Sequence, residues 1–232
     1  MEDAQSEAMY DSFADAFDAH AHQSAYNALY DRPAVLGLVG DVYGLDVLDA
    51  GCGPGFYTQS LVRAGARVTA FDASPKMVEL TRGKVAGAAE VLVADLERPL
   101  DCFGDASFDL VVLALVLHHV DNRVAMLSEL RRVLRPGGRL VLSTVHPMAD
   151  WQRLGGSYFE RDSVSEQWND GWAVRFWRQP LSAWCQEFHE AGFLIERLVE
   201  PLPQDAMREV DPATFEKLRR SPVFIAFSLL AP

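Results

Sequence analysis

The chain has 232 residues, enough for one α/β domain with a sizeable core and too few for two full ones. Hydrophobic residues make up 49% of it and charged residues 23%, as in an ordinary globular protein, and no apolar run is long enough to span a membrane. The net charge of −12 repels phosphate backbones and anionic membranes, so we expect neither nucleic acid nor membrane as a partner.

The cysteines and the N-terminus both indicate a cytoplasmic location. The three cysteines, Cys52, Cys102 and Cys185, are odd in number and widely spaced, and they show no metal-binding pattern. They fit a reducing compartment better than a disulfide framework, and we predict no metal site. The acidic stretch 1–13 lacks the basic and apolar segments of a secretion signal.

Helices are expected first, followed by alternating strands and helices. Residues 1–45 predict helices interrupted at 31–34, where Pro33 fits a first helical turn. Further helices are expected at 56–65, after the N-cap Ser74, and after Asp121 as N-cap, the last ending at 135–138. Strands are expected at 46–50, 67–73, 90–96, 107–117 and 139–145.

The strand pattern predicts a doubly covered parallel sheet. Strands that are apolar throughout are buried on both faces, and strand–helix alternation favours parallel pairing. Residues 148–180 look loop-like and aromatic, and a helix resumes at 180–193. The final strands are expected at 194–199 and 223–230.

A glycine-rich stretch, VLDAGCGPGF at 47–56, follows the first predicted strand. Glycine lets a backbone approach a ligand closely and allows turns with positive φ. The dinucleotide-binding pattern is G-x-G-x-x-G, whereas this chain has Gly51, Gly53 and Gly55 at alternate positions and Phe56 at the last glycine's place. The turn alone is weak evidence for either kind of cofactor.

Three acidic residues near strand ends help to decide between a dinucleotide and another kind of cofactor. Asp49 precedes the turn, Asp72 ends the second predicted strand and Asp95 the third. A carboxylate at the end of the second strand suits ribose hydroxyls. Asp49 would repel a dinucleotide phosphate but would favour a cofactor with ammonium and sulfonium charges.

The ordered motifs resemble the class I S-adenosylmethionine-dependent methyltransferases, in particular the small-molecule branch of the ubiquinone/menaquinone-biosynthesis type. VLDAGCGPG, FDAS, VADL, FDLVVLALVLHHV and RVLRPGGRLVLSTVHP resemble successive family motifs over residues 26–147. The resemblance implies a Rossmann-like α/β fold. It has a seven-stranded, mostly parallel sheet with an antiparallel last strand, helices on both faces, a helical N-terminal cover and an aromatic insertion after strand five.

The resemblance also implies a binding site for S-adenosylmethionine. Gly51, Cys52, Gly53 and Gly55 would line the methionyl part with Asp49 nearby, and Asp72 would bind the ribose beside Ala73. The adenine would meet Asp95 and Leu96, and Leu113 would lie beneath the cofactor. Alternatively, Asp72 caps the helix after Ser74, and Asp95 is a solvated loop acid.

Three histidines follow strand ends on the expected ligand side: His118, His119 and His146. Methyl transfer needs alignment, exclusion of water and, for a nucleophile of high pKa, a general base. Histidine is the natural base near neutral pH, and His119 is our first choice. Alternatively, His118 and His119 form a structural strand-to-helix cap, and His146 with Pro147 only turns the chain.

All five tryptophans lie between residues 151 and 184. We therefore interpret 1–232 as one methyltransferase domain with four parts: a cover at 1–45, a cofactor core at 46–147, a substrate lid at 148–180 and the rest of the sheet at 181–232. Trp168, Trp172 and Tyr158 are the candidate substrate residues, and aromatics there favour a flat or apolar molecule. Alternatively, these side chains pack on the N-terminal helices or on a second subunit.

The N-terminal cover supplies two more candidates. Arg32 could meet the methionyl carboxylate, and Tyr26 the cofactor or substrate. Related sequences carry a tyrosine where this chain has Phe17, which removes a hydroxyl contact.

The expected function is methyl transfer from S-adenosylmethionine to an O, N or C nucleophile of a small metabolite. Two rivals remain: a nicotinamide-dependent oxidoreductase, and a cofactor-binding protein without transferase activity.

Overall fold

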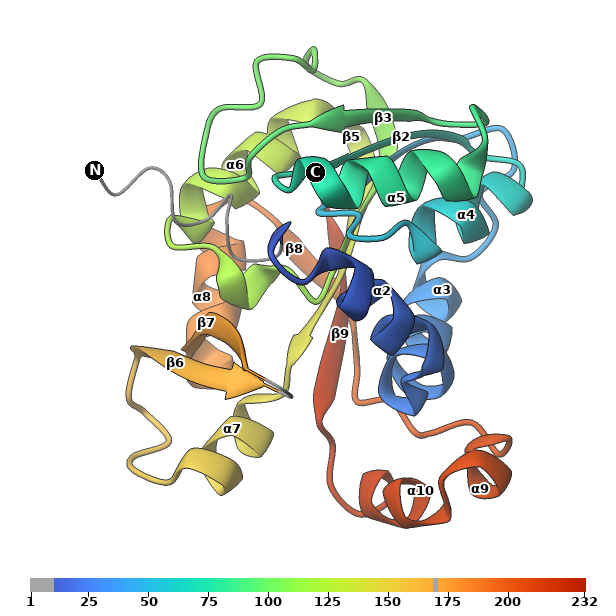
Figure 1. The fold of residues 1–232 in the computed structure, drawn as a ribbon. Helices are drawn as coiled ribbons and strands as arrows, with labels where there is room; N and C mark the ends of the chain where they lie inside the picture. The colour runs from blue at the N-terminus through green and yellow to red at the C-terminus, as the bar shows by residue number, and fades with distance from the viewer. Residues whose placement is uncertain (1–10, 169–170) are drawn as a thin grey trace.

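A seven-stranded sheet forms the centre of the molecule (Figure 1), seen in a computed structural model that describes residues 11–168 and 171–232. Its strands, in spatial order, are β3 (Glu90–Val93), β2 (Arg67–Asp72), β1 (Asp46–Ala50), β4 (Phe108–Ala114), β5 (Leu134–Val145), β9 (Phe224–Leu230) and β8 (Leu194–Val199). The first five are parallel, whereas β9 runs antiparallel to both β5 and β8. The predicted fold class is confirmed.

Helices cover both faces of this sheet (Figure 1). One face packs against α3 (Arg32–Val39), α4 (Phe56–Arg63) and α5 (Pro75–Val85). The other face packs against α6 (Arg123–Val133) and α8 (Leu181–Glu190). Because both faces are covered, most residues of β1 and β4 are buried. The strand order reverses between these two strands, which is where ligands bind in such sheets.

From residue 11 onward the N-terminal region is mostly helical, as predicted; the prediction for residues 1–10 lies outside the described residues. This region contains α2 (Ala14–Gln23), a five-residue π-helix (Asn27–Asp31) and α3, with Pro33 in the first turn of α3. The predicted interruption at 31–34 is a change of helix type, because Arg32 keeps helical backbone angles. Single π-helical turns often mark functional sites.

The described parts of 148–180, residues 148–168 and 171–180, contain more regular secondary structure than predicted. They contain most of α7 (Pro147–Leu154) and an antiparallel hairpin of β6 (Asp162–Trp168) and β7 (Trp172–Arg178). The loop-like interpretation was wrong because one hairpin face mixes apolar and charged residues: Val164, Glu166 and Trp168 lie opposite Phe176, Val174 and Trp172. Contacts to other elements, described below, hold the hairpin in place.

Two helix boundaries differ from those predicted. Asn122, rather than Asp121, is the N-cap of α6, and its side chain makes no capping bond. The helix ends at Val133, and residues 134–138 belong to β5, since Gly137 donates a backbone hydrogen bond to Ala231 in the C-terminal segment. The side chain of Asp121 instead accepts hydrogen bonds from β7, as described below.

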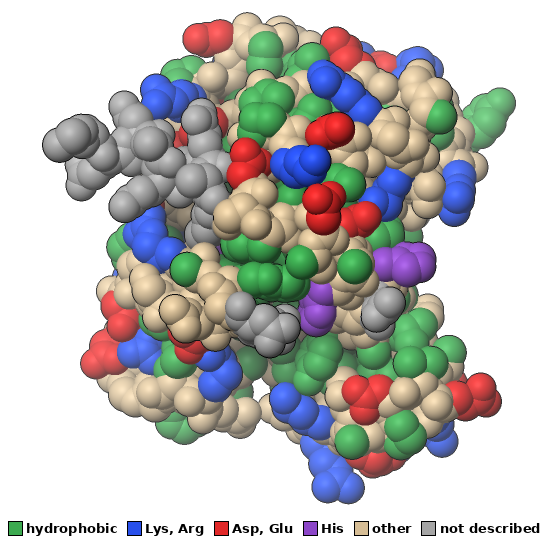
Figure 2. All heavy atoms as spheres, viewed as in Figure 1, with side chains coloured by type: hydrophobic (Ala, Val, Ile, Leu, Met, Phe, Trp, Pro, Cys, Tyr) green, Lys and Arg blue, Asp and Glu red, His purple; other side chains and the backbone are tan. Residues whose placement is uncertain are grey.

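The short helices α9 (Met207–Val210) and α10 (Pro212–Leu218) form a lobe beside β9. On the face drawn in Figure 2, the surface is notched between this lobe and the one formed by α7 and the hairpin. Within residues 11–168 and 171–232, every helix is too short or too polar to cross a membrane.

Candidate active site

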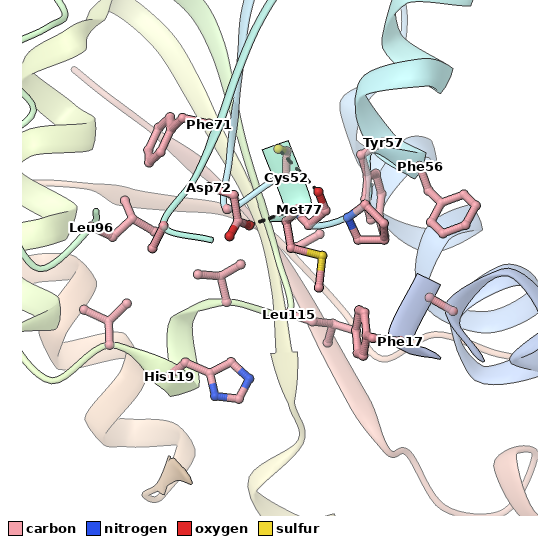
Figure 3. A pocket seen from close by; sticks show the side chains of 18 of the residues that line it. Phe17, Cys52, Phe56, Tyr57, Phe71, Asp72, Met77, Leu96, Leu115 and His119 are labelled. Carbon is pink, nitrogen blue, oxygen red and sulfur yellow. Dashed lines mark hydrogen bonds between the residues drawn. The ribbon is translucent and has the colours of Figure 1, made fainter. Parts of the chain in front are cut away.

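A cavity of about 230 Å³ lies beyond the carboxyl ends of β1, β2 and β4 (Figure 3). In Figure 3, Asp72 and Leu96 form one wall, Phe56 and Tyr57 the opposite wall, and Phe17 and His119 the far end. Of the predicted site residues, it is lined by Arg32, Gly51, Cys52, Gly53, Asp72, Ala73, Asp95, Leu96 and His119.

The glycine turn forms the cavity wall beneath β1. All three glycines have positive φ, +69° at Gly51, +52° at Gly53 and +87° at Gly55. A Cβ on Gly51 would come within 2.6 Å of Val116, and one on Gly55 within 2.7 Å of Thr81, whereas one on Gly53 would meet no atom within 4 Å. Gly51 and Gly55 thus permit close packing within the protein, and Gly53 keeps its side of the cavity open.

Asp72 connects the end of β2 to this turn. Its carboxylate accepts hydrogen bonds from the backbone N–H groups of Gly53 at 2.8 Å and Ser74 at 2.9 Å. Burial raises the pKa of Asp72, and these two bonds oppose the rise. A carboxylate has about four lone-pair sites, so acceptor capacity remains beyond the two backbone bonds.

Asp49 lies behind the turn rather than on the cavity wall. Its side chain is buried and accepts a 2.5 Å hydrogen bond from the hydroxyl of Thr58 on α4. Burial raises the pKa of Asp49 to about 7, and the charge of Asp72 adds to this rise. A cation in the cavity would stabilise the ionised form.

The loop after β3 contributes Asp95, Leu96 and Glu97 to the lining. Asp95 accepts a 2.9 Å hydrogen bond from the backbone of Glu97, so part of its function is to shape the loop. Leu96 is buried and offers an apolar surface beside Phe71.

The π-helix and the start of α3 bring Asp31 and Arg32 to the cavity, where they contact Tyr57 and Phe56 of α4. Tyr57 donates a 2.6 Å hydrogen bond to Asp31, whose pKa burial raises to about 6. The guanidinium of Arg32 lies 4.6 Å from the centre of the Phe56 ring, and its buried Nε has no hydrogen-bond partner within residues 11–168 and 171–232. A buried cation with an unsatisfied donor, beside a cavity, suits an anionic ligand group.

The three predicted histidines occupy different environments. His119 lines the cavity, and its Nδ1 donates a 2.9 Å hydrogen bond to the backbone carbonyl of Arg175 in β7. Burial lowers the pKa of His119 to about 4. His118 lies behind it, 3.0 Å from the hydroxyl of Thr144, and burial lowers its pKa as well.

His146 lies outside the cavity lining and caps α7. Its Nδ1 accepts a 3.0 Å hydrogen bond from the backbone of Met148, and its Nε2 lies 3.0 Å from a carboxylate oxygen of Glu200. The histidine at the cavity is therefore His119.

Trp172 and Trp168, on the hairpin, are not part of the cavity lining. Trp172 stacks on Phe13 with ring centroids 5.0 Å apart and lies 6.2 Å from Phe17, which does line the cavity. Trp168 packs against Phe176, with ring centroids 6.4 Å apart. The hairpin and α2 thus meet over the far end of the cavity.

Four further predicted residues lie outside the lining. Tyr158 accepts a 3.2 Å hydrogen bond from the backbone of Leu181, and Tyr26 accepts one of 3.3 Å from Lys217. Leu113 is buried within β4, and Gly55 is the N-cap of α4.

The sequence did not single out several lining residues. Leu115 enters the cavity wall because its backbone is left-handed, with φ +57°, and no sequence signal marks a leucine for that conformation. Strained backbone of this kind tends to occur at functional sites. Asn27 and Asp31 line it because of the π-helix, whereas Met77 could have been found as a buried position one turn after Ser74.

Comparison with known proteins agrees with this geometry. A family model described as a methyltransferase domain matches residues 48–142. The chain is 31% identical to a demethylmenaquinone methyltransferase of Tropheryma whipplei over 170 residues, which cover 72% of this chain and 70% of that protein. It is 35% identical to a ubiquinone biosynthesis O-methyltransferase of Xanthomonas oryzae, over 56% of each chain.

A solved structure is similar over nearly its whole length. An S-adenosylmethionine-dependent methyltransferase from Mesorhizobium loti superposes with a TM-score of 0.69 at 25% identity, covering 90% of this chain and 99% of that one. The chain therefore belongs to the class I S-adenosylmethionine-dependent methyltransferases, and its cofactor is S-adenosylmethionine. The nicotinamide alternative is excluded.

Proposed function

We propose that this enzyme methylates an O, N or C nucleophile on a small, flat or apolar metabolite. The observation that carries the proposal is the far end of the cavity. His119 lies there with the apolar side chains of Phe17 and Leu115 (Figure 3). Such a surface suits an apolar molecule with one group that can donate a hydrogen bond.

The residues of the cavity fit the cofactor. Gly53 leaves open space for it, Arg32 offers the methionyl carboxylate a buried donor, and Asp72 has acceptor capacity for the ribose hydroxyls. Asp95 and Leu96 line the part of the cavity proposed for adenine. When bound, S-adenosylmethionine supplies an electrophilic methyl group.

His119 is the proposed general base. Its Nδ1 donates to a carbonyl, so the neutral ring keeps Nε2 unprotonated. The low pKa keeps the imidazole neutral at physiological pH, which is the protonation state that a general base needs, and it also makes the ring a weak base. The apolar walls, together with α2 and the hairpin above them, would exclude water.

A labelling experiment tests the substrate class. The enzyme is incubated with methyl-labelled S-adenosylmethionine and a cell extract divided into apolar small molecules, polar small molecules, nucleic acids and proteins. We expect label in the apolar fraction, and quinone precursors are the first compounds to test because two relatives are named for quinone biosynthesis. Label confined to another fraction would contradict the proposal. Tight cofactor binding without any labelled product would favour the binding protein without activity.

A variant tests the base. His119→Gln is expected to lower kcat by roughly 10²-fold or more while the Kd for S-adenosylhomocysteine stays the same. His189→Gln, at an exposed histidine of α8, is the matched control. Unchanged kcat in His119→Gln would remove His119 from catalysis.

A further inference from the structure

Asp121 links the segment after His119 to the hairpin. Its carboxylate accepts two hydrogen bonds from β7, one from Nε1 of Trp177 and one from Nη2 of Arg175, both at 2.5 Å. We call Asp121, Arg175 and Trp177 the hairpin latch. Sequence reasoning assigned Asp121 to the N-cap of α6, a position that Asn122 occupies.

The latch is held from two other sides. The backbone N–H groups of Asp121 and Asn122 donate to the carboxylate of Glu97, which lines the cavity after the proposed adenine residues. The guanidinium of Arg123 lies 5.1 Å from the centre of the Trp177 ring and forms an ion pair with Glu187. The latch therefore joins the loop after β3, α6 and β7.

The position of β7 determines which nitrogen of His119 carries the proton. The carbonyl of Arg175, one of the latch residues, lies 2.9 Å from Nδ1 of His119. A carbonyl can only accept a hydrogen bond, so Nδ1 must be the protonated nitrogen of the neutral ring. The tautomer of a histidine is set by the hydrogen bond of its other nitrogen, and here that bond comes from a separate element.

The hairpin needs such ties to stay in place. A two-stranded sheet is marginally stable by itself, so the position of its edge carbonyls depends on side-chain contacts to the rest of the fold. The side-chain contacts of Asp121 fix β7 close to the three-residue helix Leu117–His119.

We propose that Asp121 is a positioning residue: by holding Arg175 and Trp177, it keeps the Arg175 carbonyl on Nδ1 of His119 and leaves Nε2 as the proton-accepting nitrogen. The catalytic consequence rests on the proposed role of His119 as base. The effect of Asp121 on the tautomer of His119 is independent of that role and can be measured without a substrate.

The test is ¹⁵N NMR of the histidine rings in full-length protein, with the His119 signals assigned from the His119→Gln variant. We expect Nδ1 of His119 to be protonated in the wild type. In Asp121→Ala, the Nδ1 signal should shift toward the unprotonated position and the Nε2 signal toward the protonated one. An Nδ1–H tautomer that persists in Asp121→Ala overturns the proposal.

Asp162→Ala is the matched control, because Asp162 also accepts two hydrogen bonds from a β7 side chain, those of Arg178 at 2.6 and 3.1 Å. It should leave the His119 tautomer unchanged. An equal shift in Asp162→Ala would also contradict the proposal, since it would mean that any loosening of the hairpin suffices.

Thermal melting and binding of S-adenosylhomocysteine show whether Asp121→Ala is correctly folded. A second variant tests the latch if Asp121→Ala misfolds. Trp177→Phe keeps a ring beside Arg123 and removes one latch donor. It should shift the tautomer in the same direction and by less, and no shift would count against the latch. If the tautomer shifts as expected while His119→Gln keeps full kcat, the latch stands and the proposed base fails.

Discussion

The hydroxyl of Thr58 donates a 2.5 Å hydrogen bond to the buried carboxylate of Asp49, directly behind the glycine turn. This bond lowers the pKa of Asp49, but burial outweighs it, and the pKa rises to about 7. In the protein without cofactor, Asp49 therefore titrates near neutral pH, next to a cavity that binds a sulfonium cofactor.

Cofactor affinity should consequently depend on pH. Between pH 5.5 and 7.5, the affinity for S-adenosylmethionine should increase as Asp49 ionises, because the carboxylate attracts the sulfonium charge. The increase should be smaller for S-adenosylhomocysteine, whose sulfur is neutral. Isothermal titration at several pH values measures both affinities. In Asp49→Asn, the pH dependence of the two affinities should be nearly the same. Parallel pH profiles for the two ligands would show that Asp49 does not sense the sulfonium.

The same carboxylate should affect the stability of the cofactor-free protein. Its pKa is higher in the folded chain than in the unfolded chain, so the folded state binds the proton more tightly between about pH 4 and 7. Ionisation of the buried carboxylate therefore destabilises the folded protein. This destabilisation is absent below pH 4, grows between about pH 4 and 7, and is complete above pH 7. Asp49→Asn should thus raise the thermal midpoint at pH 8 and leave it nearly unchanged at pH 4. A variant less stable than the wild type at pH 8 would contradict this.

Two glycines of the same turn should respond differently to alanine. Gly53→Ala places a methyl group in open space at the cavity, so affinity for S-adenosylhomocysteine should fall while stability drops by only about 1–2 kcal/mol from the left-handed backbone. Gly55→Ala would place its methyl group 2.7 Å from Oγ1 of Thr81 and 3.0 Å from its Cα, so the main loss should be stability. Melting curves and titrations separate the two effects, and identical behaviour of the variants would contradict the assignment.

Arg32 should recognise the amino-acid end of the cofactor. Arg32→Gln is expected to weaken binding of S-adenosylhomocysteine by about tenfold or more, because the carboxylate of the ligand then loses its cationic hydrogen-bond donor. Binding of 5′-methylthioadenosine, which lacks the amino-acid part, should barely change. Arg63→Gln, on the last turn of α4, serves as the control. An equal loss for both ligands would mean that Arg32 acts on the fold of the cavity.

The α2 cover should slow the exchange of cofactor. Lys84 on α5 forms a 2.6 Å ion pair with Asp18 on α2, and α2 also contributes Phe17 to the cavity. Lys84→Gln should speed dissociation of S-adenosylhomocysteine a few-fold, measured by stopped-flow displacement. Lys76→Gln breaks an ion pair within α5, with Glu79, and should have no effect. Equal rates in both variants would show that the Asp18 pair does not restrain the cover.

The sheet and the cofactor wall could be predicted from sequence because their signals are local. Apolar runs predict strands, and positive φ after β1 requires glycine, so Gly51 and Gly53 could be placed without a structure. Asp72 could be placed for the same reason, since it ends a strand beside that turn.

The hairpin could not be predicted in this way. Its strands mix charged, polar and apolar residues, and their positions depend on partners distant in sequence, such as Phe13 for Trp172 and Asp121 for Trp177. The candidate substrate residues Trp168, Trp172 and Tyr158 stay predictions, because none of the three belongs to the cavity lining.

By itself, the sequence determined the chain order of the seven strands of the sheet, the glycine turn and the family, since each depends on residues close together in the chain. Only the tertiary structure decided which of three histidines faces the cavity and which nitrogen of it carries a proton. That choice rests on a contact between His119 and Arg175, 56 residues apart, and on the acid that holds the hairpin beside them. The physical reason is that a hydrogen bond is set by distance in space, which residue spacing along a chain does not specify.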